Sequence, residues 1–409
     1  MYLIYINDII DNLENQIRLF ADDTSLFVTV DSDLNSPAIS LTNDLNKIRL
    51  WSEQWLVAFN PCKTVNVNFS RRNRFQPPLS FGNNIISKCD SHCHFGLVFQ
   101  STGVWSEHVS NIHKKACQKL NILRMLKYKK SRESLINIYF SFIRPVLEYG
   151  DVVWDNCTEE QSKLLESVQI EAARIITGLR RNSSVNHLYK ELGWETLKTR
   201  RKNNKLILLF KIINNYVPDY LYDIIEHCMP TQHMYNLRQN NVYRIPVART
   251  VSYFNSFVPS TIKLWNDLTR EYKNSLTVSA FKKCLKKSTH EQVKKHKLYN
   301  HGNRLENVLH CQLRNNCSNL NADLFSHYLQ DFSNCLYCDS EWEDPKHFFM
   351  HCAKYHSQRE KLFHYMYTNA IPVNINNILY GCEDISHKEN QAFFNEVHAF
   401  IKNSKRFIQ

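Results

Sequence analysis

Residues 17–27 read Ile-Arg-Leu-Phe-Ala-Asp-Asp-Thr-Ser-Leu-Phe, and apolar residues both lead up to the paired carboxylates and follow them. This pattern predicts two short strands joined by a sharp turn, with Asp22 and Asp23 at the tip of the hairpin. Two adjacent aspartates cannot both ionise cheaply unless a cation lies between them. Hard divalent ions prefer such oxygen ligands, and two-metal phosphoryl transfer is the chemistry they support. The competing interpretation is an ordinary acidic turn, because aspartate is common in turns.

Several other segments stand around this hairpin in a fixed order. Tyr-Leu-Ile-Tyr-Ile-Asn-Asp-Ile precedes it at 2–9, and five segments follow: Trp-Ser-Glu-Gln-Trp at 51–55, Phe-Asn-Pro-Cys-Lys-Thr at 59–64, His-Phe-Gly-Leu at 94–97, Tyr-Phe-Ser-Phe-Ile-Arg-Pro-Val-Leu-Glu-Tyr-Gly-Asp at 139–151, and Ala-Ala-Arg-Ile-Ile-Thr-Gly at 172–178. Their order and spacing resemble the reverse transcriptase of non-LTR retrotransposons, in particular elements of the jockey type. The resemblance covers nearly the whole chain.

The resemblance implies roles for individual residues in an RNA-directed DNA polymerase that acts on an RNA template and a DNA primer. Asp22 and Asp23 match the metal-binding pair, which would hold Mg²⁺ for nucleotidyl transfer. Lys63 matches the lysine segment beside the site and would neutralise or protonate the leaving pyrophosphate. Phe95 and Gly96 match the primer-grip hairpin, where glycine lets the nucleic-acid backbone come close. Taken alone, Lys63 is more simply explained as a surface lysine, and a core position explains Phe95 as well as a primer contact does.

Only 21 residues precede Asp22, whereas the family's polymerase has fingers and another catalytic aspartate before this hairpin. A two-metal site needs ligands from more than one strand. We therefore expect a carboxyl-terminal portion of a longer reading frame, truncated before the first catalytic aspartate and inactive by itself. Two alternatives remain open: a non-catalytic, nucleic-acid-binding remnant of a retroelement, or a structural or interaction protein descended from one.

Charge and cysteine content bound the function further. The net charge is +12, but residues 1–60 hold nine acidic and three basic side chains, so the remainder carries +18. An acidic region followed by a large basic one suits a metal site next to a polyanion-binding surface. The sequence has no secretory signal and no apolar run of membrane-spanning length, which predicts no membrane partner. Thirteen cysteines without such a signal indicate an intracellular location, in the nucleus or the cytoplasm.

The periodicities predict an α+β protein. Residues 1–100 would form the carboxyl-terminal part of a palm, a small antiparallel sheet with a helix at 43–58, a strand at 65–69, a turn at Gly82 and a strand at 95–99. Helices with apolar faces at 109–123, 135–142 and 164–176 would form a thumb-like region at 101–182, with Pro145 as an end or kink and Gly178 as a C-cap. A second helical region, with an irregular middle at 229–259, would follow at 183–300. A region containing a zinc knuckle would occupy 301–409.

Lysines surround the first of these helices, and four of them are candidates for contacting nucleic acid: Lys114, Lys115, Lys129 and Lys130. Basic runs also occur at 200–202, 282–287 and 294–297. A single run fits a solvated surface, whereas the whole set favours binding to nucleic acid.

The pattern Cys-x2-Cys-x8-His-x4-Cys supplies three thiolates and one imidazole at a spacing suited to tetrahedral zinc. Its members are Cys335, Cys338, His347 and Cys352. Four protein donors leave no open position, so the zinc would be structural. The spacing leaves the ligand set open, because His351 or His356 could replace a donor and Cys311 and Cys317 could take part. Chance clustering in a cysteine-rich chain is the competing interpretation.

Overall fold

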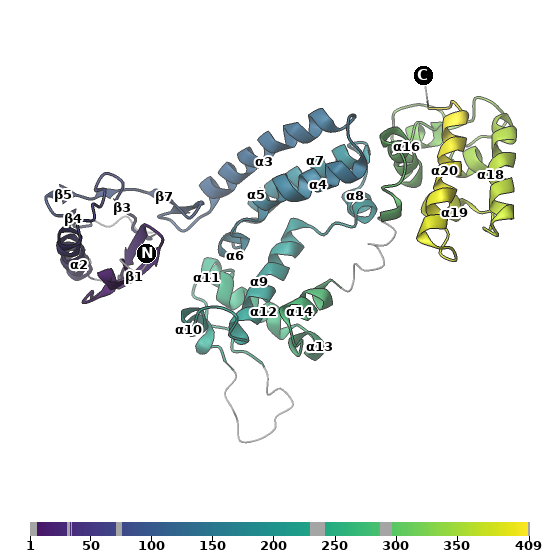
Figure 1. Cartoon of the computed structure of the whole chain (residues 1–409). Helices are drawn as coiled ribbons and strands as arrows, with labels where there is room; N and C mark the ends of the chain where they lie inside the picture. Colours follow the sequence, from purple (N-terminus) through teal and green to yellow (C-terminus); the bar gives the residue numbers. More distant parts are fainter. Residues whose placement is uncertain are drawn as a thin grey trace. The chain divides into compact units, whose positions relative to one another are not determined.

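The computed structural model describes residues 6–30, 33, 35–70, 76–229, 242–286 and 297–407. The chain forms two compact units, Met1–His108 and Val109–Gln409 (Figure 1). The first combines short strands with one long helix, and the second is helical, so the predicted α+β class is confirmed. The assignment of palm and thumb, and the finer division into four regions, remain predictions.

The first unit begins with a short 3-10 helix, η1 (Asn7–Ile10), and the predicted hairpin. Strand β1 (Gln16–Phe20) pairs antiparallel with β2 (Asp23–Phe27), and Phe20 lies opposite Asp23. Helix α2 (Asn35–Gln54) packs Ile48 against Ile6 and Ile9 in a small apolar core. The buried Asp44 of α2 accepts backbone hydrogen bonds from Glu14 and Asn15, so the helix holds the loop that leads into β1.

The remaining strands of this unit correct three sequence-based predictions. They are β3 (Val65–Asn66), β4 (Ser80–Phe81), β5 (Asn84–Ile85), β6 (Ser87–Lys88), β7 (Ser91–His94) and β8 (Leu97–Gln100). The pairings β4–β5 and β7–β8 are antiparallel, as predicted, but each is a separate two-stranded sheet and β3–β6 is parallel, so the strands do not form one antiparallel sheet. The strand at 65–69 shortens to β3, and the strand at 95–99 becomes a hairpin whose turn holds Phe95 and Gly96. The turn at Gly82 is confirmed.

Helix α2 also differs from the predicted helix at 43–58. It starts at Asn35 and ends at Gln54, because Leu56 adopts a left-handed backbone (φ 56°) and the Val57 N–H bonds back to the Ser52 carbonyl. Asn60-Pro61 therefore lies beyond the helix instead of ending it.

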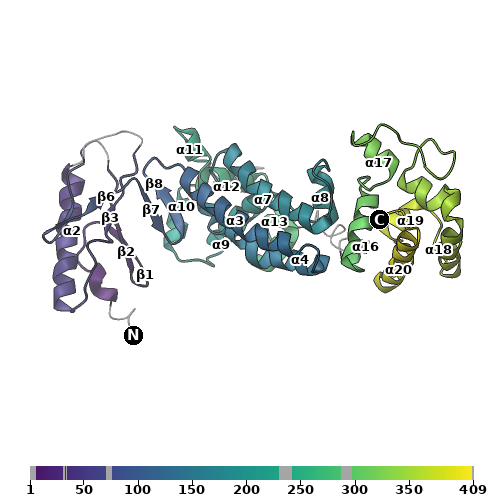
Figure 2. The same ribbon diagram turned by 90° about the horizontal axis from the view of Figure 1, so that it is seen from above.

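Consecutive helices, three of them long, form the first half of the second unit (Figure 2). They are α3 (Ser106–Leu126), α4 (Arg132–Ile138), α5 (Arg144–Glu148), α6 (Asp151–Trp154), α7 (Glu159–Thr177), α8 (Val185–Leu192) and α9 (Leu197–Ile213). A π-helical turn, η2 (Tyr139–Ile143), joins α4 to α5, and Pro145 lies in the first turn of α5, where no intrahelical N–H is needed. Gly178 caps α7 in a left-handed conformation, as predicted.

Shorter helices follow: α10 (Tyr220–Glu226), α11 (Val251–Phe254), α12 (Phe257–Asn266), α13 (Arg270–Lys273) and α14 (Val278–Leu285). Of these, α10, α12 and α14 pack against α9 around Phe210, Trp265 and Phe281. The predicted irregular middle is partly helical, since α11 and α12 begin within it, and its residues 230–241 lie outside the described residues. The same holds for Lys287 and 294–296 of the basic runs.

The carboxyl-terminal part holds α16 (Arg304–Arg314), α17 (Asn321–Ser326), η4 (His347–His351), η5 (Ala353–Tyr355), α18 (His356–Thr368), α19 (Ile375–Tyr380) and α20 (His387–Asn403). Phe348, Phe349, Phe394 and Phe400 fill its core. Within the described part of the chain, no helix is long and apolar enough to cross a membrane.

A buried ionic cluster joins this part to the preceding helices. Both Arg132 of α4 and Arg314 of α16 donate to the carboxylate of Glu191 in α8, at 2.8 and 2.9 Å to the same oxygen. All three side chains are at most 4% exposed. We call this set the Arg–Glu–Arg triad. Nearby, Gly178 approaches α16 so closely that an added Cβ would lie 2.6 Å from Val308.

Candidate functional site

The aspartate hairpin places one carboxylate in the turn and the other at the start of a strand. Ala21 and Asp22 form the two-residue turn, and Asp23 is the first residue of β2. Ala21 is left-handed (φ 54°), a conformation that costs an L-residue roughly 1–2 kcal/mol. Both aspartates are exposed. In the described part of the chain, no further His, Cys or carboxylate joins them in a three-donor cluster.

A second hairpin packs beside the first. The rings of Phe20 and Phe95 meet edge to face with centroids 4.8 Å apart, and Ser25 Oγ lies 3.3 Å from His94 Nε2. Phe95 and Gly96 both have positive φ (48° and 76°), the requirement of the tight turn that suits twisted strands. The fold thus brings the Phe95-Gly96 turn next to the aspartate hairpin, although Phe95 is 75 residues from Phe20 in sequence, and Phe95 remains 42% exposed.

Lys63 lies on a turn that the preceding segment builds. The Asn60 side chain accepts from the Cys62 N–H at 3.0 Å, and its carbonyl accepts from the Lys63 N–H at 3.1 Å. Asparagine forms this kind of turn readily. The Lys63 side chain is exposed, so the segment presents it to solvent.

The second candidate site is a four-residue cluster that we call the Cys₃His cluster: Cys335, Cys338, His347 and Cys352. Its ligand atoms all lie within 4.8 Å of one another. The Sγ atoms of Cys335 and Cys352 are 3.8 Å apart, and Cys338 Sγ is 3.4 Å from His347 Nε2. Tetrahedral zinc with Zn–S bonds of about 2.3 Å requires donors about 3.8 Å apart. The donor set and its spacing therefore fit zinc.

Local backbone structure assembles this cluster. The Tyr337 N–H points at Cys335 Sγ (3.5 Å), which forms the knuckle around the first two cysteines. The π-helical turn η4 places the Cys352 N–H on the His347 carbonyl at 2.9 Å, so residues five apart face the same side. Beneath it, the buried Arg359 donates to the carbonyls of Phe349 and Cys352. Burial, together with the neighbouring thiols, raises the pKa of Cys335 to about 12, which a bound cation would reverse.

The alternative zinc donors lie outside this cluster. His351 and His356 are exposed, and His356 pairs with Glu360 at 3.3 Å. Cys311 and Cys317 are buried elsewhere in the carboxyl-terminal part. His347 is therefore the histidine that the fold brings to the three cysteines.

The basic residues divide into two groups. Lys114, Lys115, Lys129 and Lys130 are exposed on and after α3, next to the 80% exposed Tyr128. The run at 200–202 does not form a free basic surface: Arg200 pairs with Glu148, and the buried Arg201 pairs with Asp155. That correction has a simple cause, because both guanidiniums neutralise carboxylates inside the helical packing.

Sequence reasoning missed the Arg–Glu–Arg triad. Glu191 is separated from Arg132 by 59 residues and from Arg314 by 123. Burial raises the pKa of its carboxyl, but the charges of Arg314 and Arg132 outweigh burial and hold that pKa at about 2. Long-range pairing of this kind leaves no local signal in the sequence.

Comparisons with known proteins support the resemblance drawn from the motifs. No protein-family model matches the chain. Three curated Drosophila melanogaster proteins are similar to it: the RNA-directed DNA polymerase from mobile element jockey (26% identical over 172 residues, 41% of this chain), the probable RNA-directed DNA polymerase from transposon X-element (25% over 169 residues, 40%), and that from transposon BS (22% over 187 residues, 44%). The matched stretch covers 19%, 18% and 20% of these relatives. The chain thus resembles non-LTR retrotransposon polymerases over about two fifths of its length, which is less than the nearly complete coverage predicted from the motifs.

Proposed function

We propose that this chain supplies part of the catalytic centre of an RNA-directed DNA polymerase of a non-LTR retrotransposon, which copies an RNA template from a DNA primer. The similarity to the jockey, X-element and BS polymerases supports this assignment. The observation that carries it is the exposed Asp22-Asp23 turn, packed against the Phe95-Gly96 turn. The resemblance drawn from the sequence implies a role for both motifs, and the contact between Phe20 and Phe95 supports a shared one.

In this proposal Asp22 and Asp23 hold Mg²⁺, which would stabilise charge on the attacking and leaving oxygens of nucleotidyl transfer. Their exposure fits ligands that must reach a nucleic-acid end and a nucleotide. Lys63 provides a positive charge for the leaving pyrophosphate. Phe95 and Gly96 contact the primer, where the bare backbone at Gly96 permits close approach.

The Cys₃His cluster has a different role in the proposal. Four protein donors close the coordination sphere of zinc, so the ion would stabilise the fold without taking part in the reaction. The buried Arg359 and the phenylalanine core around the cluster fit such a structural site. The free thiols throughout the chain suit a reducing compartment, and we propose the nucleus or the cytoplasm.

A hairpin exchange tests the catalytic proposal. The polymerase from mobile element jockey would receive residues 16–27 of this chain in place of its own aspartate hairpin. Primer extension on an RNA template with Mg²⁺ should survive the exchange and fall about 100-fold or more in Asp22→Asn or Asp23→Asn chimeras. The matched control is the exchanged hairpin with Arg18→Gln, which leaves the carboxylates intact. An active chimera that tolerates both aspartate substitutions would refute the assignment.

The chain by itself should show no template-dependent extension. Asp22 and Asp23 lack a third carboxylate among the described residues, and a two-metal centre needs ligands from several strands. A radiolabelled primer on an RNA template measures this directly. Extension that disappears in Asp22→Asn would mean that the chain assembles a complete centre alone.

A further inference from the structure

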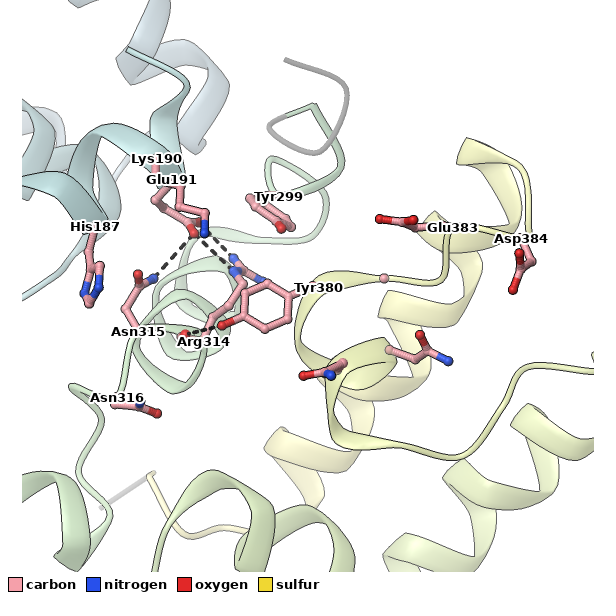
Figure 3. Close-up of a pocket in the computed structure, with 13 residues that line it drawn as sticks. His187, Lys190, Glu191, Tyr299, Arg314, Asn315, Asn316, Tyr380, Glu383 and Asp384 are labelled. Carbon is pink, nitrogen blue, oxygen red and sulfur yellow. Dashed lines mark hydrogen bonds and ion pairs between the residues drawn. The ribbon is translucent and has the colours of Figure 1, made fainter. Parts of the chain in front are cut away.

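A cavity of about 660 Å³ lies within the second unit, and no residue of either candidate site lines it (Figure 3). Its walls come from α8, the carboxyl end of α16, and α19 with the loop that follows. His187 and Lys190 line one side, Glu383 and Asp384 the other, and Tyr299, Arg314 and Tyr380 lie between them. The volume is that of a typical small-molecule site.

Buried arginines give one side of this cavity a positive charge. Arg314, at its floor, belongs to the Arg–Glu–Arg triad, in which two buried guanidiniums share one carboxylate and leave one positive charge in excess. The Tyr299 ring covers Arg314, with 3.9 Å between the guanidinium carbon and the ring centroid. A buried excess charge is costly unless a counter-ion compensates it.

Lys190 is exposed at the cavity wall and contributes a mobile positive charge. This side of the cavity therefore favours an anionic group such as phosphate.

The opposite wall limits which phosphate compound fits. Glu383 and Asp384 are exposed carboxylates that would repel a second phosphate, as in a continuous nucleic-acid strand. Carboxylates accept hydrogen bonds from ribose hydroxyls, the contact by which dinucleotide-binding folds hold ribose. The Tyr380 ring, 38% exposed, offers a flat face for a base, and Asn376 supplies an amide for its edge.

We propose that this cavity binds a nucleoside 5′-monophosphate, with the phosphate toward Lys190 and Arg314 and the ribose toward Glu383 and Asp384. The inference does not depend on polymerase activity, because it rests on residues outside the aspartate hairpin. The ligand would compensate the excess charge of the triad and link α8 to the carboxyl-terminal part.

Isothermal titration calorimetry on the full chain at low salt tests the proposal with AMP, 2′-deoxy-AMP, adenosine and inorganic phosphate. AMP should bind at least tenfold more tightly than each of the other three. Lys190→Gln should weaken AMP about tenfold, the effect of losing one charge-assisted contact. Lys163→Gln, which removes another exposed lysine, from α7, should leave the affinity unchanged. Circular dichroism verifies that both variants are folded.

Three results would overturn the proposal: no binding of AMP, equal affinities of AMP and inorganic phosphate, or AMP binding that is unaffected by Lys190→Gln. A 5′-phosphorylated oligonucleotide of ten thymidines distinguishes a free mononucleotide from the phosphorylated end of a nucleic-acid strand. If it displaces AMP and binds more tightly, the cavity takes a strand end and the mononucleotide is excluded. If it fails to displace AMP, the mononucleotide assignment stands.

Discussion

The two candidate metal sites are built in opposite ways. The aspartate hairpin offers two exposed carboxylates at a tight turn, supported by one neighbouring hairpin and a small apolar core. The Cys₃His cluster offers four donors, and a core of phenylalanines surrounds it. An exposed, incomplete donor set suits ions that arrive with a substrate, whereas a closed set suits an ion that stays.

The contrast extends to how each site is held. Neighbouring residues close the Cys₃His cluster, through the knuckle at Tyr337 and the π-helical turn η4. The aspartate hairpin instead depends on Phe95, which comes from a distant part of the chain. The Cys₃His cluster should therefore depend on its metal for local stability, and the aspartate hairpin should depend on the rest of the first unit.

Removing zinc should produce the largest effect on stability. If it does not, the contrast between the Cys₃His cluster and the aspartate hairpin fails. Structural zinc contributes about 10–16 kcal/mol of apparent binding free energy in small domains, so Cys338→Ser should lose the metal and loosen residues near 330–360. Elemental analysis should give one zinc per native chain and close to none in the variant. Amide hydrogen exchange should rise around η4 and α18 but remain unchanged in α2.

The controls for this prediction are cysteines outside the cluster. Cys62→Ser and Cys89→Ser should retain one zinc per chain, because both residues lie in the first unit. His347→Ala should also lose zinc. If His347→Ala keeps the metal while His351→Ala loses it, the histidine that the fold brings to the cysteines is not the ligand. Less than half an equivalent in native protein purified without chelator would count against the cluster as a zinc site.

Local patterns were sufficient to predict the aspartate hairpin, the Cys₃His cluster and the Gly178 cap, because each depends on residues close in sequence. Boundaries set by single backbone conformations were missed, such as the end of α2 at Gln54, which the left-handed Leu56 determines. Pairings across long loops were missed as well. The charges at 200–202 look like a surface run, yet Arg201 is buried against Asp155, since helix packing, not composition, decides which charge meets which.

The Arg–Glu–Arg triad should give the next largest effect. Glu191→Gln keeps the side-chain shape but leaves two buried guanidiniums without a carboxylate, which should cost about 3–5 kcal/mol. Urea unfolding monitored by hydrogen exchange should show the loss in α8 and α16, while α2 in the first unit stays unchanged. The matched control is Glu159→Gln, whose exposed pair with Lys198 should contribute at most about 1 kcal/mol. Equal losses in the two variants would mean that the triad does not hold the second unit together.

The next largest effect should be a loss of stability of the carboxyl-terminal part in mild acid. His310 Nε2 must donate to the Ile378 carbonyl (3.1 Å), so its Nδ1 accepts from His398 Nε2 (3.1 Å) and both rings are neutral. Burial, then the charges of His301 and Arg314, lowers the pKa of His398 to about 4, despite Glu306 at 3.6 Å. Because the unfolded chain binds protons first, stability is complete above about pH 6.5 and falls as the pH drops toward 4.

The pH effect should reach up to about 3 kcal/mol and can be measured as the urea midpoint between pH 7 and pH 4. His398→Phe removes one of the two titrating rings and should flatten this dependence. His356→Phe, at a side chain that is 72% exposed, should not. A pH dependence that is identical in the two variants would show that the buried histidine pair does not limit stability in acid.

The smallest predicted effect is on RNA binding by the lysines around α3. It tests which surface of the second unit contacts nucleic acid. Replacing Lys114, Lys115, Lys129 and Lys130 with glutamine should weaken binding to single-stranded RNA and lower the salt slope by about 0.7 for each lysine that contacts a phosphate. Fluorescence anisotropy at several salt concentrations gives both values. The matched control replaces four other exposed lysines of the second unit: Lys163, Lys361, Lys388 and Lys402. If both quadruple variants lose the same slope, the attraction comes from the overall charge of +12, and α3 is not a dedicated contact surface.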